Sequence, residues 1–225
     1  MSSVLRLIGL RIAVLSMKLI FLFYFLVFIQ IVTAITGGIR YKYLPLPLKI
    51  LEGLILVSVV EVFVQWILGT HHIHNAWTSH VYTLIEIVCI SVIYFVWLKN
   101  DTYRFMLLVC LSSFIVFWVV SKFTFEPFSM LDGWSASVSK IIQITFSVFI
   151  LVEVIKENDI VWTDDPRFWV VASVIIYSAG ILFWFALFNK MLSVSPDRLR
   201  QVTSINWIMT SISYLLFARS FLCKR

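Results

Sequence analysis

The sequence predicts an all-α protein, a polytopic transmembrane helical bundle with seven spans. Seven apolar blocks of about membrane-spanning length follow one another, with only short polar gaps between them. The chain is 61% hydrophobic and only 13% charged, whereas a soluble domain carries about 25% charged residues. A bilayer core ~30 Å thick needs ~20 helical residues at ~1.5 Å each. We therefore expect residues 1–225 to form one membrane-embedded domain.

Prolines, glycines and acidic residues mark the gaps between the blocks. Pro45 lies in the first gap, and Pro127 and Gly133 lie in the fourth. Asp165-Pro166 suits a helix start, since carboxylates are favourable near the positive end of the helix dipole. The predicted spans are about residues 17–36, 48–68, 80–98, 105–121, 135–155, 168–188 and 201–220.

The first block also has a competing interpretation as a cleaved signal peptide. Basic residues precede it, and Val32-Thr33-Ala34 resembles a signal-peptidase site. The block is long, however, and Arg40 and Lys42 follow closely, where secreted proteins tend to avoid positive charge. We expect an uncleaved first helix.

The distribution of basic residues predicts the orientation, because Lys and Arg are enriched on the cytoplasmic side. The net charge of +6 suits span ends that face anionic headgroups, and needs no nucleic-acid partner. The loop over residues 69–79 has no Lys or Arg and is easily translocated. We expect the N-terminus outside and the C-terminus inside. Seven basic residues lie on the outer side (Arg6, Arg11, Lys18, Lys122, Lys190, Arg198, Arg200) and ten on the inner side (Arg40, Lys42, Lys49, Lys99, Arg104, Lys156, Arg167, Arg219, Lys224, Arg225).

Five of the predicted spans each carry one line of polar side chains at helical spacing. Such lines indicate either an internal polar site or hydrogen-bonded contacts between helices, and for Ser, Thr and Asn the second interpretation is favoured. The lines are Ser58, Glu61 and Gln65; Ser79, Tyr82, Glu86 and Cys89; Lys140, Gln143 and Ser147; Ser173, Tyr177, Gly180 and Trp184; and Thr203, Asn206, Thr210 and Ser213.

Ionisable residues inside spans are functional candidates because they are expensive to bury. Glu61 and Glu86 lie ~11 Å and ~9 Å below the outer loop at ~1.5 Å per residue. A buried Glu paired with Lys140 would balance charge, whereas Glu52 and Glu153 are expected to pair at the inner face with nearby lysines. The predicted ligand-binding pocket opens outward and is lined by Glu61, Tyr82, Glu86, Lys140, Tyr177 and Asn206.

A histidine-rich loop suggests a metal site as an alternative. Imidazoles at this spacing can bind zinc or copper, although a closed site would need Glu61 or Glu86 as well. A pH-sensitive or interfacial loop is the favoured interpretation, and no cofactor is expected. The candidate metal ligands are His71, His72, His74 and His80.

The stretch from Asn75 to Glu86 has the motif Asn75-x-Trp77-x-x-His80-x-Tyr82-x-x-x-Glu86. This motif resembles that of a family of small uncharacterised bacterial seven-span membrane proteins. Three further segments resemble the same family more weakly. They are residues 47–61, residues 165–180 and the region around Asn206. The family often has an acidic residue where this chain has Ser139 and Lys140. Related spans occur ahead of histidine kinases, so the resemblance implies a bacterial inner membrane and a sensory role.

These observations favour a receptor-like or regulatory integral membrane protein that binds a small molecule, lipid or partner in the outward pocket. It would act through an unidentified cytoplasmic protein, and a homo-oligomer is an alternative assembly. Three other classes stay open: a metal-dependent membrane enzyme acting on lipid, a proton-coupled small transporter, and a membrane component of a bacterial defence locus.

Overall fold

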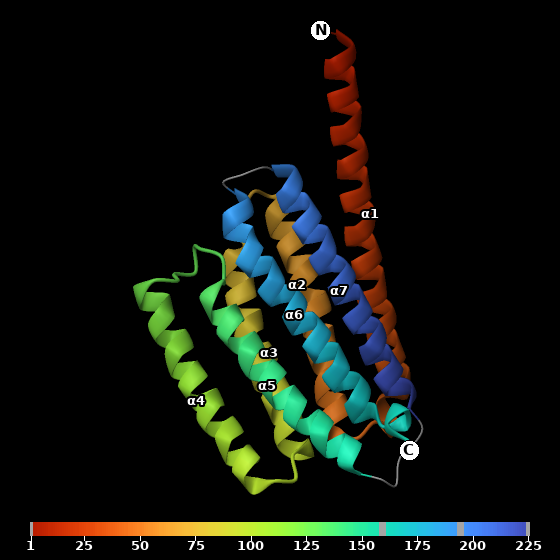
Figure 1. The fold of residues 1–225 in the computed structure, drawn as a ribbon, viewed down its shortest axis with the longest axis vertical. Helices are drawn as coiled ribbons and strands as arrows, with labels where there is room; N and C mark the ends of the chain where they lie inside the picture. Colours follow the sequence, from red (N-terminus) through yellow and green to blue (C-terminus); the bar gives the residue numbers. More distant parts are fainter. Residues whose placement is uncertain (1, 158–160, 193–195, 224–225) are drawn as a thin grey trace.

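The computed structural model describes the backbone over residues 2–157, 161–192 and 196–223, and side chains over 20–157, 161–187 and 200–223. Every long element in these ranges is a helix, which confirms the predicted all-α class (Figure 1). Two short 3-10 turns, η1 (Tyr41–Tyr43) and η2 (Trp162–Asp164), lie in connections. The helices are α1 (Ser2–Arg40), α2 (Leu46–Thr70), α3 (Ala76–Trp97), α4 (Asp101–Thr124), α5 (Trp134–Lys156), α6 (Pro166–Leu192) and α7 (Pro196–Leu222).

Six segments of the described chain are long and apolar enough to cross a membrane, which makes this a membrane protein by length and composition. Helix α7 is not among them, because polar residues such as Asn206, Thr210 and Ser213 interrupt its apolar sequence. The six segments are Ile20–Tyr43, Leu46–Thr70, Ala76–Trp97, Asp101–Thr124, Trp134–Lys156 and Pro166–Leu187.

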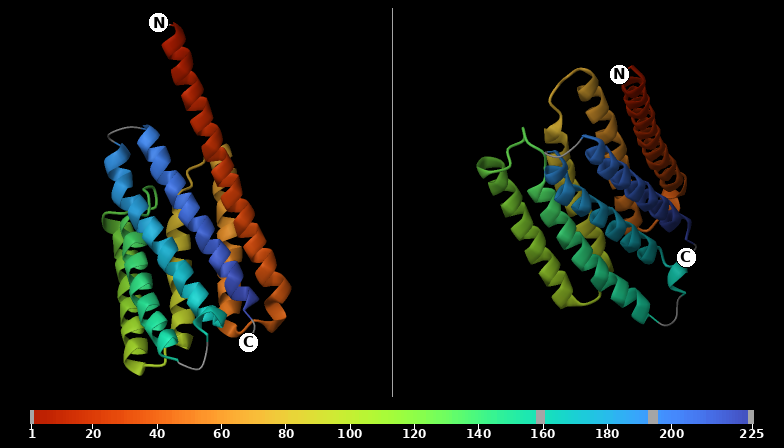
Figure 2. Two further views of the ribbon diagram at one scale, coloured as in Figure 1. Left: turned by 45° about the vertical axis from the view of Figure 1, so that its right-hand side comes forward. Right: turned by 45° about the horizontal axis from the view of Figure 1, so that its top comes forward.

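Helix α4 lies at the edge of the bundle, where it packs on α3 and α5 (Figures 1 and 2). The other helices form a ring in which α1 contacts α2 and α7, α6 joins α7 to α5, and α3 joins α5 to α2. The α2–α3 and α4–α5 connections lie at the end of the bundle from which α1 projects, together with the last turn of α6 and the first turn of α7 (Figure 2). The C-terminal end of α7 lies at the opposite end (Figure 1).

Hydroxyl groups connect the helices of this ring. The Thr33 hydroxyl of α1 donates to the Tyr214 carbonyl at 3.1 Å, and the Tyr214 hydroxyl donates to Ser58 on α2 at 2.8 Å. Ser173 of α6 donates to the Ser213 carbonyl of α7 at 2.7 Å. Such contacts are the interhelical hydrogen bonds expected for the Ser and Thr lines.

Two predicted ion pairs at the inner face are absent from the described side chains. Glu52 is buried, both of its carboxylate oxygens have no hydrogen-bond partner there, and Lys49 lies over the ring of Tyr41 instead. Glu153 accepts a hydrogen bond from the backbone N–H of Lys99 rather than from a lysine side chain. The prediction was wrong because a spacing of three residues allows an ion pair on a helix but does not enforce one, and the side chains of Lys49 and Glu153 have other contacts.

Candidate functional site

Glu86 and Lys140 form an ion pair in the interior of the bundle. The Lys140 ammonium donates to Glu86 Oε1, and both side chains are buried. The Lys140 nitrogen also lies 4.5 Å from the centroid of the Tyr177 ring, a cation–π distance. The predicted partnership of Lys140 with a buried glutamate is present, and we call Glu86, Lys140, Tyr82 and Tyr177 the interior cluster.

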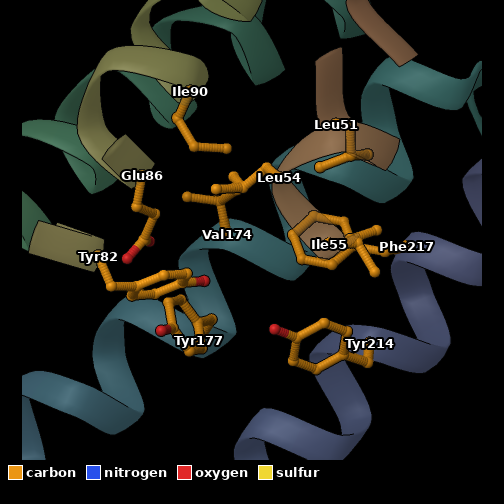
Figure 3. A pocket seen from close by; sticks show the side chains of 10 residues that line it. All are labelled: Leu51, Leu54, Ile55, Tyr82, Glu86, Ile90, Val174, Tyr177, Tyr214 and Phe217. Atoms are coloured by element: carbon orange, nitrogen blue, oxygen red, sulfur yellow. The ribbon is translucent and has the colours of Figure 1, made fainter. Parts of the chain in front are cut away.

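A small cavity adjoins the interior cluster. Tyr82, Glu86 and Tyr177 line it together with Tyr214, and the other lining side chains are apolar (Figure 3). The hydroxyls of Tyr82 and Tyr214 point toward each other across it. Its volume of about 20 Å³ holds about one water molecule. This volume is far below the ~300 Å³ of the smallest ordinary ligand pockets. The cavity therefore has room for a water molecule that could relay a proton, but not for a ligand of ordinary size.

Neither Glu61 nor Asn206 lines this cavity. The Glu61 carboxylate is half-buried and accepts a hydrogen bond from Gln65, one turn along the same helix. Asn206 sits against Gly180, where a Cβ would meet its Oδ1 at 3.5 Å. Of the six predicted ligand-binding residues, the structure brings together four: Tyr82, Glu86, Lys140 and Tyr177.

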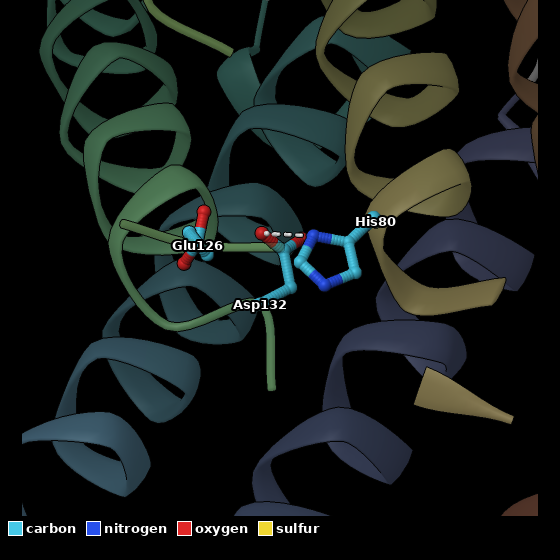
Figure 4. A group of neighbouring side chains, drawn as sticks. All are labelled: His80, Glu126 and Asp132. Carbon is cyan, nitrogen blue, oxygen red and sulfur yellow. Dashed lines mark ion pairs between the residues drawn. The ribbon is translucent and has the colours of Figure 1, made fainter. Parts of the chain in front are cut away.

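A second buried polar group lies nearer the end of the bundle from which α1 projects. It joins His80 of α3, Lys122 of α4, Glu126 and Asp132 of the α4–α5 loop, and Ser135 of α5, and we call it the loop cluster (Figure 4). The Lys122 nitrogen lies 2.5 Å from His80 Nδ1, 2.9 Å from Glu126 Oε2 and 3.1 Å from Ser135 Oγ. All five side chains are buried.

Glu126 fixes the loop cluster to the start of α5. Its Oε1 accepts from the Trp134 N–H at 2.6 Å, and its Oε2 accepts from the Ser135 N–H at 3.2 Å and from the Ser135 hydroxyl. The first N–H groups of a helix have no partner within it and carry the positive end of its dipole. Glu126 therefore caps α5 and counters the Lys122 charge at once.

The other histidines do not join His80. The His71 ring bonds the Ile67 carbonyl at 2.9 Å, and His74 bonds the Ser129 carbonyl at 2.9 Å. His72, two residues after the end of α2, has a positive φ of 56°. Of the four predicted metal ligands, only His80 belongs to a group of described residues with metal-ligand spacing, and its companions there are Glu126 and Asp132.

A larger groove opens beside the loop cluster. Its volume is about 670 Å³, within the range of small-molecule sites. Glu126 contributes to its wall, so the groove and the loop cluster share a residue. Apart from Glu126 and Ser137, the wall is apolar or glycine: Phe125, Met130, Leu131, Gly133, Trp134, Leu182, Phe185 and Ala186.

Sequence reasoning missed Lys122, Glu126 and Asp132 as a site, because Lys122 was interpreted as a charge at the membrane surface. One signal was present: Lys122 and Glu126 are four residues apart, the spacing of a helical ion pair. Nothing in the spacing of Asp132 indicates that its loop folds back onto His80.

A scan for protein families, a search of curated proteins and a search of solved structures found no match. The resemblance to the bacterial seven-span family therefore stays a prediction. The function is argued from the geometry of this chain.

Proposed function

We propose that this chain is a receptor-like, regulatory integral membrane protein whose ligand is a small apolar molecule or lipid bound in the groove beside the loop cluster. The observation that carries the proposal is Glu126, which contributes both to the groove wall and to the buried charge network. A ligand pressed against the Trp134 end of α5 would disturb the contacts that hold Lys122 and His80.

The interior cluster would pass that change across the membrane. Lys140 lies on α5, the helix whose first turn Glu126 caps, and it pairs with Glu86 of α3. A shift of α5 therefore alters both charged groups together, since helices are stiff over this length. A cytoplasmic partner at the C-terminal end of the bundle would receive the signal.

This proposal includes seven spans in a bacterial inner membrane, with the N-terminus outside. The polar residues that lower the hydropathy of α7 face inward, since Thr210, Ser211 and Ser213 are buried. Ile205, Ile208, Ile212 and Leu215 are exposed at spacings of three and four residues, which places them on one face. An apolar outer stripe with polar residues turned inward is typical of a helix surrounded by lipid on one side only.

Native mass spectrometry of protein purified with its own lipids would test the groove. We expect wild-type protein to retain a molecule of defined mass that Ala186→Trp, which fills the groove from an exposed position, no longer retains. Val148→Trp on the exposed side of α5 is the matched control and should retain it. Equal retention in wild type and Ala186→Trp, or no retained molecule in either, would overturn the proposal.

A further inference from the structure

The loop cluster holds more negative than positive charge. Glu126 and Asp132 face a single lysine among the described side chains, and both are buried. Lys122 offers three protons, and its three nearest acceptors are His80, Glu126 and Ser135. Asp132 lies 3.6 Å from the ammonium, and neither of its buried oxygens has a hydrogen-bond partner among the described residues. A buried carboxylate without a donor calls for another cation.

The tautomer of His80 leaves a lone pair directed at this gap. His80 Nε2 lies 2.9 Å from the Met130 carbonyl, which can only accept, so the ring proton belongs on Nε2. The Nδ1 lone pair then accepts from the Lys122 ammonium at 2.5 Å, and Nδ1 lies 3.3 Å from Asp132 Oδ1 (Figure 4). Metal-binding histidines characteristically donate their other N–H to a backbone carbonyl or carboxylate.

The separations of the donor atoms suit a small divalent ion. One atom from each of His80, Glu126 and Asp132 lies within 4.8 Å of the others. Corners of a tetrahedron whose centre is ~2.0–2.1 Å away lie ~3.3 Å apart, the separation of His80 Nδ1 and Asp132 Oδ1. One imidazole and two carboxylates are ligands that zinc and its neighbouring transition metals accept.

We propose that His80, Glu126 and Asp132 form a binding site for a divalent transition-metal ion such as Zn²⁺, for which the Lys122 ammonium competes. The ion takes the His80 lone pair and one oxygen of each carboxylate, while Lys122 withdraws toward the ring of Trp118, whose centroid lies 5.3 Å from its nitrogen. The groove supplies an entry path, since Glu126 contributes to its wall. The site rests on the loop cluster alone and does not depend on the proposed receptor function.

Metal loading of detergent-purified protein tests the site directly. Protein stripped with a chelator is titrated with Zn²⁺ or Co²⁺, and bound metal is counted by mass spectrometry while Co²⁺ absorption reports the ligands. We expect one ion per wild-type chain and a loss of affinity of at least about 100-fold in Asp132→Asn and His80→Gln. Lys122→Met removes the competing charge and is expected to raise the affinity at least about tenfold.

Two control variants separate this site from the other candidates. His71→Ala/His72→Ala/His74→Ala removes the remaining histidines and should leave metal binding unchanged. Glu86→Gln/Lys140→Met changes the interior cluster without leaving an unpaired charge there and should also bind one ion. Absence of bound metal in wild type, equal binding in Asp132→Asn, or loss in the triple histidine variant would each overturn the proposal. If Lys122→Met fails to fold, Asp132→Asn still decides the question, because it differs from the native residue by one polar atom.

Discussion

Glu86 and Lys140 form an ion pair in the bundle interior, so each supplies the charge that compensates the other. Breaking a buried pair by removing one partner leaves an uncompensated charge, whereas replacing both is often neutral. We expect Lys140→Met to lower the free energy of unfolding by about 3–5 kcal/mol. The Glu86→Gln/Lys140→Met double variant should recover most of that loss. Denaturant unfolding in detergent micelles measures both values.

Conservative replacement of a lipid-facing residue provides the control for this pair. Val148→Met on exposed α5 surface should change the free energy of unfolding by less than about 0.5 kcal/mol. A double variant as unstable as Lys140→Met alone would show that the two side chains do not act as a pair.

Glu52 is a buried carboxylate at the end of the bundle opposite the loop cluster. Its carboxylate lies against Gly37, where an added Cβ would clash with it and would approach Phe221 to 2.9 Å. Since neither oxygen has a hydrogen-bond partner among the described side chains, Glu52→Gln should raise stability by about 1–3 kcal/mol. Gly37→Ala should lower it, and should do so less in a Glu52→Ala background. Thermal unfolding of Glu52→Gln tests the first expectation, and a cycle of wild type, Gly37→Ala, Glu52→Ala and their double variant measures the coupling between these positions.

Single residues were predictable where a helix alone determines their position. Lys140 and Glu86 lie at similar depth on regular helices, so their pairing follows from spacing and from the need to balance charge. Asp132 lies in a nine-residue connection, 125–133, whose path depends on bonds such as that between His80 and the Met130 carbonyl. Those bonds form only once α3 and α4 are packed, and no local pattern encodes them.

At the scale of the elements, charged side chains join the end of α5 to the start of α6. Arg167 at the start of α6 bonds Glu157 at 2.6 Å and Asp165 at 2.6 Å, while Lys99 lies 2.7 Å from Glu157. The hydrogen bonds from Arg167 and then from Lys99 lower the pKa of the Glu157 carboxyl from 4.5 to about 2. A lowered pKa stabilises the fold above pH 4.5 and loses that contribution as the pH falls toward 2.

We therefore expect the thermal midpoint of the wild type to fall between pH 4.5 and pH 2 partly through Glu157. In Glu157→Gln that part of the fall should be absent, and the midpoint at neutral pH should be slightly lower than in wild type. The change in the thermal midpoint should be smaller than the pKa shift of Glu157 alone implies, because its Lys99 partner is exposed and the interaction is screened by salt. Identical pH profiles for the two proteins would contradict the assignment.

The helices themselves follow from hydropathy, because lipid leaves backbone amides no partner outside a helix. The predicted start of α6 is confirmed: the helix begins at Pro166, and Asp165 accepts the Arg167 N–H at 2.8 Å. The peripheral place of α4 was not predictable, since its apolar sequence suits lipid and protein neighbours equally well. Apolar composition shows that a helix crosses the bilayer and leaves its neighbours undetermined.

At the scale of the whole molecule, the excess of basic residues on the inner side predicts the orientation. This excess grows when Lys122 is no longer counted on the outer side. Lys122 was counted as an outer basic residue, but it is buried and paired with Glu126, so it does not face headgroups. Arg40, Lys99 and Arg104 lie near helix ends on the proposed inner side. Seven of the counted side chains lie outside the described residues: Arg6, Arg11, Lys18, Lys190, Arg198, Lys224 and Arg225.

Cysteine labelling of intact cells tests the orientation and the number of spans together. In a chain whose three native cysteines are replaced, His72→Cys in the α2–α3 loop should react with a membrane-impermeant maleimide. Asp101→Cys, at an exposed position at the start of α4, should react only after the cells are opened. Cys223 follows α7 and therefore tests whether this helix crosses the membrane. If seven helices cross it, a chain that keeps Cys223 as its only cysteine should behave like Asp101→Cys. Labelling of Cys223 in intact cells, with Asp101→Cys protected, would place both ends of α7 outside and leave six spans.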